Sequence, residues 1–407
     1  MNIINHHILK IIKILILLFT SMTSTAWAFE FEVNGFGSIV ASRTISDEPL
    51  GSDTRSTYLV VSTIATNDDG TRNPDARIDN KWSFKPDSNL AFQFKAKSEF
   101  GLSATAQVTA QAANSLDPEF EWLYLSYAIN DSLSFNAGRQ RLPLYLHSDH
   151  LDVGYTYHWV RPPIDIYGGE GVSRYHGASL LYTTELANIE TEIHLYAGNI
   201  KNDNTQQYRA RIKDLYGAII TGTYDWLTLR AAYHIGENYT DNANEVTLNP
   251  QTISKEKPAD LYFASFGFIA DFNRYFFEGE IIRLGVEPYF ENVTLNSIAP
   301  GIGSLSRIGD SLAYMLTGGY RFKTVTLHLT WSERQFYQSI PSIPQVANLT
   351  ELERHSWSIG GRWDFHSNMA FKTELTVAKD GSPAITKKLF GHFLENTILS
   401  IGVDYIF

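Results

Sequence analysis

The sequence predicts an all-β fold: a transmembrane antiparallel β-barrel of about 16 strands, with long extracellular loops and short periplasmic turns. Three observations lead to this prediction. Apolar residues alternate with polar or small ones in segments of about 10 to 13 residues, which is the period-two signature of strands. The connections between these segments alternate strictly between short and long. Beyond the N-terminal segment, no run approaches the ~18 apolar residues of a spanning helix, so a membrane-embedded chain must close into a barrel.

The N-terminal segment, residues 1–28, is typical of a secretory signal peptide. Lys10 and Lys13 supply the positive charge, residues 14–19 form the apolar run, and Ala26-Trp27-Ala28 provides a small-x-small cleavage site. The apolar run is too short for a membrane anchor. We therefore expect a mature chain that starts at Phe29 and leaves the cytoplasm.

The mature chain divides into strand pairs, and the last strand shows the alternation most clearly. In residues 396–407, one face carries Thr397, Leu399, Ile401, Val403, Tyr405 and Phe407. The same pattern predicts strands at 29–43, 88–98, 101–113, 120–129, 132–141, 174–184, 189–199, 213–224, 226–237, 260–271, 274–286, 310–321, 324–335, 354–365, 368–379 and 396–407.

The long connections hold much of the Asp, Asn, Pro and Gly. No composition shift marks a second domain, so residues 29–407 are expected to form one barrel. Long loops are expected at 44–87, 114–119, 142–173, 200–212, 238–259, 287–309, 336–353 and 380–395. Tight turns at one end and long loops at the other are what an outer-membrane barrel requires.

Composition excludes several classes of function. The 407 residues contain no cysteine, which removes disulfides and thiolate metal or nucleophile sites. Without the two leader lysines the formal charge falls from −11 to −13, which disfavours a nucleic-acid partner. No glycine-rich nucleotide loop couples the chain to an energy source, and we expect no cofactor.

Together, the leader, the strand pairs, the terminal Tyr405-Ile406-Phe407 and the long charged loop at 142–173 resemble the sixteen-stranded porins of the Gram-negative outer membrane. The resemblance implies partners in outer-membrane lipid and lipopolysaccharide, and an assembly signal at Tyr405 and Phe407 that the barrel-assembly machinery reads. It also implies that loop 142–173 folds into the lumen as the constriction. A homotrimer is one implied state, but the short second loop departs from the trimeric pattern, so a monomer stays open.

A barrel of this size leaves an aqueous channel, so the sequence predicts passive diffusion of small hydrophilic solutes and ions. Charge at the constriction then sets what passes. The candidate constriction residues are Asp149, Asp152, Arg161, Asp165 and Glu170. Alternation places further charges on the pore wall, where they either meet solutes or pair with one another: Lys95, Lys97, Arg230, Arg321, Arg362, Lys372, Glu278 and Glu280.

Other interpretations remain open at this stage. A saccharide-selective or anion-selective channel is one, because lumen aromatics can stack on sugar rings; the same rings could instead pack the loop onto the wall. These rings are Tyr145, Tyr155, Tyr157, Trp159, Tyr167 and Tyr175. A barrel hydrolase using His328 with Ser332, or His234, and an adhesin are less favoured, and no catalytic or metal site is expected. Strand-end tryptophans are expected to form interfacial girdles: Trp82, Trp122, Trp226, Trp331, Trp357 and Trp363.

Overall fold

The computed structural model describes residues 29–45, 78–168, 173–201, 208–242, 247–248, 251–252, 259–286, 310–337, 352–382 and 395–407. The predicted leader, residues 1–28, lies outside this part, and so does Glu170. None of the described helices is long and apolar enough to cross a membrane.

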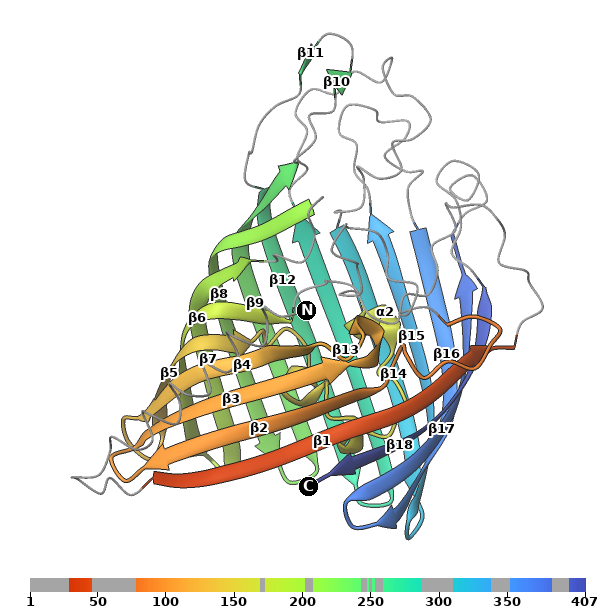
Figure 1. Ribbon diagram of the computed structural model, residues 1–407, viewed down its shortest axis with the longest axis horizontal. Helices are drawn as coiled ribbons and strands as arrows, with labels where there is room; N and C mark the ends of the chain where they lie inside the picture. Colours follow the sequence, from red (N-terminus) through yellow and green to blue (C-terminus); the bar gives the residue numbers. More distant parts are fainter. Residues whose placement is uncertain are drawn as a thin grey trace, which may run out of the picture.

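Sixteen antiparallel strands close into one barrel (Figure 1), which confirms the predicted fold class and strand number. A separate two-stranded pair, β10 (Thr247–Leu248) and β11 (Gln251–Thr252), lies beyond the rim. The barrel strands are β1 (Phe29–Thr44), β2 (Asn89–Ser98), β3 (Leu102–Gln111), β4 (Pro118–Ala128), β5 (Leu133–Arg141), β6 (Arg174–Leu186), β7 (Ile189–Lys201), β8 (Tyr208–Tyr224), β9 (Leu227–Asn242), β12 (Ala259–Phe272), β13 (Tyr275–Val286), β14 (Asp310–Arg321), β15 (Val325–Tyr337), β16 (Leu352–His366), β17 (Met369–Asp380) and β18 (Asn396–Ile406).

Each strand pairs with its sequence neighbour, and β1 closes the barrel against β18. Tight turns gather at the end where β1 begins and β18 finishes. The β6–β7 turn consists of Ala187 and Asn188, both with positive φ, as a two-residue hairpin turn of the favoured hand requires. The predicted alternation of short and long connections is therefore confirmed.

The outer face of the barrel is apolar. Side chains such as Ile281, Leu316 and Leu229 are exposed, because strand alternation turns every second residue away from the lumen. An apolar exterior around a closed barrel is the surface that faces lipid. Trp226, Trp357 and Trp363 are likewise exposed, but the girdle prediction is wrong for Trp122, which lines a cavity of the lumen.

The seam between β1 and β18 is sealed by the two terminal aromatics. Gly35 exchanges two backbone hydrogen bonds of 2.9 Å with Phe407. The rings of Tyr405 and Phe407 stack with centroids 5.9 Å apart, and they lie directly over Gly37 and Gly35. The absence of a side chain at these two glycines therefore makes room for the aromatic end of the chain.

The alternation is interrupted at several register shifts, and the one between β3 and β4 bears on the long loop between β5 and β6. The β3–β4 register shifts between Gln107 and Val108, which leaves Glu121 as an extra residue on β4. The neighbouring Arg141, at the end of β5, pairs with Asp152 and lies 3.7 Å from Glu121. Alternation alone would place Arg141 outside, but these contacts turn it toward the loop inside the barrel.

Candidate functional site

The long connection between β5 and β6 folds back into the lumen. We call residues 142–168 the inner loop. It contains three short helical turns, η3 (Ser148–His150), η4 (Gly154–Thr156) and α2 (Ile164–Tyr167), and α2 packs against β14, β15 and β16. Tyr155 donates a 2.8 Å hydrogen bond to the carbonyl of Ser367 in the β16–β17 turn. The inner loop therefore reaches from the long-loop rim to the opposite end of the barrel (Figure 1).

The first anchor of the inner loop is a pair of buried carboxylates on β13. Glu280 accepts hydrogen bonds of 2.8 Å from the Leu146 backbone N–H and from the Tyr167 hydroxyl. Glu278 Oε2 lies 2.9 Å from His147 Nε2. Both glutamates, predicted as pore wall, face the lumen, but the inner loop covers them.

The second anchor is Lys372 on β17. Its ammonium donates to the carbonyls of Gly154 (2.6 Å) and Trp159 (2.8 Å) and pairs with Asp404 Oδ2 at 2.8 Å. The side chain is only 1% exposed. Arg362, on β16, donates to the Tyr157 carbonyl at 2.9 Å. Both predicted wall cations therefore donate hydrogen bonds to loop carbonyls, and Lys372 also neutralises the Asp404 carboxylate. Because it is buried, Lys372 is out of reach of a passing solute.

Two charged residues of the inner loop bind the wall in turn. Asp165, which is fully buried, accepts hydrogen bonds from Ser332 (2.8 Å) and from Arg354. Arg161 binds both carboxylate oxygens of Asp87, one of them at 2.8 Å. Bidentate, charge-assisted contacts of this kind are strong and geometrically specific. They fix the second half of the inner loop.

The start of the inner loop is held by β9 and β12. Arg230 donates to the carbonyls of Pro143 and Leu144, and Ser265 donates to the latter at 2.8 Å. Trp159 is completely buried and its indole N–H donates to Thr330 at 2.8 Å. Three loop aromatics, Tyr145, Tyr157 and Trp159, are thus buried between loop and wall together with Tyr175 of β6, which is the packing alternative to sugar stacking.

The remaining predicted site residues lie away from these anchors. Asp149 is exposed on the inner loop and forms no ion pair with another described residue. Lys97 pairs with Glu32 across β1 and β2, and Lys95 lies on the same inner face of β2. Arg321 pairs with Asp271 at 2.7 Å near the β12–β13 turn.

Three histidines of the inner loop have shifted pKa values. Burial alone would lower the pKa of His147, but the hydrogen bond between His147 and Glu278 raises this pKa above 6.5. The stabilisation of the docked loop by protonated His147 is therefore fully present below pH 6.5. Burial and the charge of His147 lower the pKa of His150 to about 4. Burial, with His328 nearby, holds the pKa of His158 well below 6.5. The docked loop therefore favours neutral His150 and His158.

Sequence reasoning missed several partners of the inner loop. Asp87, Arg334, Arg354 and Asp404 each contact it or its anchors. Charges in the middle of a barrel strand point inward because a lipid-facing charge is costly. That signal was available for Arg334 and Asp404, whereas Asp87 falls within a predicted long loop.

Two cavities lie beside the inner loop. One, of about 470 Å³, separates Val153 from the inner faces of β1 to β4. The other, of about 160 Å³, lies between Asp149 and the β7–β9 wall, where Glu192 and Arg230 line it. The inner loop therefore leaves unfilled space between itself and the wall at both places.

No protein-family model matches the sequence, and no curated protein matches it. Among solved structures, the chain is similar to the outer membrane channel DcaP of Acinetobacter baumannii, with 11% identity over 94% of this chain and 99% of that chain and a TM-score of 0.56. It is also similar to an anion-selective porin of Comamonas acidovorans, with 12% identity over 93% of this chain and 100% of that chain and a TM-score of 0.52. OmpT of Vibrio cholerae, in a trimer form, gives the same four values.

Barrel closure, the apolar exterior and these similarities define the class by its fold: the chain is a closed β-barrel with an apolar, lipid-facing exterior, the fold of the outer-membrane barrels to which it is similar. Within that class it has the sixteen-stranded fold of the porins, as the sequence predicted.

Proposed function

We propose that the chain is a porin, a water-filled channel for passive diffusion of small hydrophilic solutes and ions, with loop 142–173 as its constriction. One observation carries the proposal: the inner loop is anchored along its length to the arc of the wall that runs from β9 through β12–β18 to β1. Because sixteen strands enclose more space than their own side chains fill, a loop fixed to one side narrows the lumen without filling it. The cavities beside Val153 and Asp149 support this reading.

The anchoring also suggests a preference among ions. Arg230 and Lys372, two of the predicted wall cations, are buried against loop carbonyls. Asp149 and Glu190, by contrast, are exposed. Since exposed charges dominate the field in a wet pore, we expect a modest preference for cations over anions, which disfavours the anion-selective alternative.

Catalysis is not part of the proposal, nor is a cofactor. Of the residues considered for a hydrolase, Ser332 donates a hydrogen bond from its hydroxyl to the Asp165 carboxylate, and His234 Nδ1 lies 2.7 Å from the Tyr196 hydroxyl. Both groups thus serve packing contacts in the described lumen. An adhesive role for the long external loops would be secondary.

The proposed partners follow from the proposed location. They are outer-membrane lipid and lipopolysaccharide, and the barrel-assembly machinery, which would read Tyr405 and Phe407. A homotrimer is proposed in preference to a monomer, since OmpT of Vibrio cholerae, one of the similar structures, is in a trimer form. Analytical ultracentrifugation in detergent distinguishes the two states.

Single-channel conductance of the purified, refolded protein in a planar bilayer tests the channel. We expect stable open steps and, under a salt gradient, a reversal potential of the sign for cation preference. Silence from protein with confirmed barrel structure would overturn the porin proposal. An anion-selective reversal potential would overturn only the inference about Asp149 and Glu190.

A further inference from the structure

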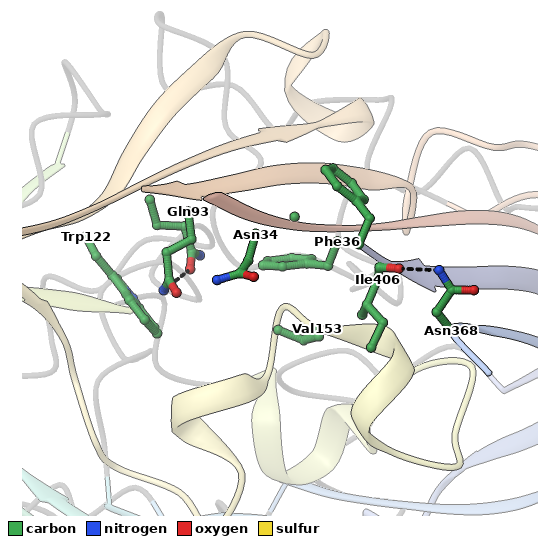
Figure 2. Close-up of a pocket in the computed structure, with 10 residues that line it drawn as sticks. Asn34, Phe36, Gln93, Trp122, Val153, Asn368 and Ile406 are labelled. Carbon is green, nitrogen blue, oxygen red and sulfur yellow. Dashed lines mark hydrogen bonds between the residues drawn. The ribbon is translucent and has the colours of Figure 1, made fainter. Parts of the chain in front are cut away.

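The larger of the two cavities differs in chemistry from the rest of the lumen. It lies at the short-turn end of the barrel, where Asn368 of the β16–β17 turn and Ile406 of β18 close one side (Figure 2). All ten lining side chains are uncharged. Elsewhere the described lumen wall is dense in Glu, Asp, Arg and Lys. An uncharged cavity of about 470 Å³ has the size of a small-molecule site.

Side-chain amides supply its polar groups. Asn34 lies on β1, Gln93 on β2 and Gln107 on β3, in adjacent ladder positions. The Gln93 and Gln107 amides form a 3.4 Å hydrogen bond with each other, and Figure 2 shows Asn34 pointing toward this pair. Each amide can donate and accept hydrogen bonds. A row of amides suits hydroxyl groups, which also do both.

Apolar surface flanks the amides. The Trp122 ring stands at one end of the row and Phe36 lies near the other, while Val153 of the inner loop faces them across the cavity (Figure 2). Aromatic faces pack on apolar C–H surfaces. A sugar ring presents such a surface on one face and hydroxyl groups around its edge, so it matches both components.

The charges on the same strand faces do not line the cavity. Glu32 and Lys97 pair with each other, and Lys95, two residues from Gln93, is not among the lining residues either. A charged solute in the cavity would lose hydration and find no counter-charge among the side chains that line it, which is costly. A neutral hydroxylated solute loses water hydrogen bonds that the amides can replace.

We propose that this cavity is a subsite for uncharged, polyhydroxylated solutes with an apolar ring face, that is, mono- and disaccharides. The inference deepens the proposed porin function and rests on it for its biological meaning. It places sugar recognition at Trp122, Gln93 and Asn34 instead of at the aromatics of the inner loop, which are packed.

The test uses maltose as the probe on the full-length mature protein. Maltose is added to open channels in a planar bilayer, and the reduction of KCl current is titrated. Saturation-transfer NMR on the detergent-folded protein reports maltose binding independently of conduction. Wild type should show concentration-dependent block, and Trp122→Ala should weaken the apparent affinity about tenfold, the equivalent of ~1.4 kcal/mol. Gln93→Leu keeps the side-chain size and should weaken affinity several-fold.

The matched control is Tyr124→Ala, which removes another aromatic of β4 two residues away that does not line the cavity. Its maltose affinity should equal that of wild type. Open channels with no maltose block and no NMR transfer would overturn the subsite and leave the porin proposal standing. Equal loss in all three variants would also overturn it. Maltose binding by NMR in a non-conducting barrel would support the subsite and refute the porin.

Discussion

Lys372 provides the sharpest test of what the basic wall does. Lys372→Met removes two hydrogen bonds to loop carbonyls and leaves Asp404, which is almost fully buried, without its cation. Breaking a buried ion pair by removing one partner costs about 3–5 kcal/mol. At ~1.4 kcal/mol per factor of ten, release of the inner loop should become about two to three and a half orders of magnitude more frequent. Single-channel recordings should then show frequent transitions and noisy open current.

Lys97→Met is the matched control, because Lys97 and its partner Glu32 have side chains 39% and 36% exposed. Such an exposed pair contributes little to stability, so the open current should stay quiet, with at most a shift of the reversal potential. Adding Asp404→Leu to Lys372→Met should restore part of the quiet behaviour by removing the stranded charge. If Lys372→Met shifts the reversal potential as Lys97→Met does and leaves the noise unchanged, Lys372 faces the solute and the anchoring argument is refuted.

Contacts elsewhere in the barrel also respond predictably to single changes. Gly35→Val should lower the stability of the barrel by about 1–3 kcal/mol, because a Cβ at Gly35 would lie 2.1 Å from the Phe407 ring. Urea unfolding in detergent measures this, with Gly222→Val, where a Cβ meets only an ordinary 3.4 Å contact, as control; equal midpoints would contradict the seam packing. Acidification from pH 6.5 to 4 should increase loop release, because His150 and His158 bind protons more weakly in the docked loop than in a released one. Channel gating recorded across this range checks it, and His150→Gln with His158→Gln should flatten the profile, whereas a flat wild-type profile would count against the idea.

Strand positions could be predicted from the sequence because alternation is a local property. The segment expected at 396–407 is β18, Asn396–Ile406, with Tyr405 on the predicted outer face. Alternation fails where the backbone is locally irregular. The alternation of apolar and polar residues does not reveal the bulge at Glu121 or the inward turn of Arg141. Trp122 was assigned to an interfacial girdle because tryptophans at strand ends are common in such girdles.

The contacts of the inner loop could not be predicted for a different reason. Asp165 meets Arg354 across 189 positions of the chain, and Lys372 meets Gly154 across 218. Such pairings depend on how the closed barrel brings distant strands around one loop, which no local pattern encodes. The sequence identified which residues are charged and inward; whether a charge faces water or a loop carbonyl is decided by tertiary packing.

The docking of the inner loop inside the barrel is the central claim, and a cysteine pair across its contact with β1 tests it directly. The chain has no native cysteine, and a Cβ at Gly154 would lie 2.5 Å from Ser38 Oγ. In the folded double variant Gly154→Cys with Ser38→Cys, mild oxidation should therefore give a near-complete intramolecular disulfide, detected by mass spectrometry after proteolysis. Free thiols at both positions in a barrel that is demonstrably folded would contradict the placement of the loop inside the lumen.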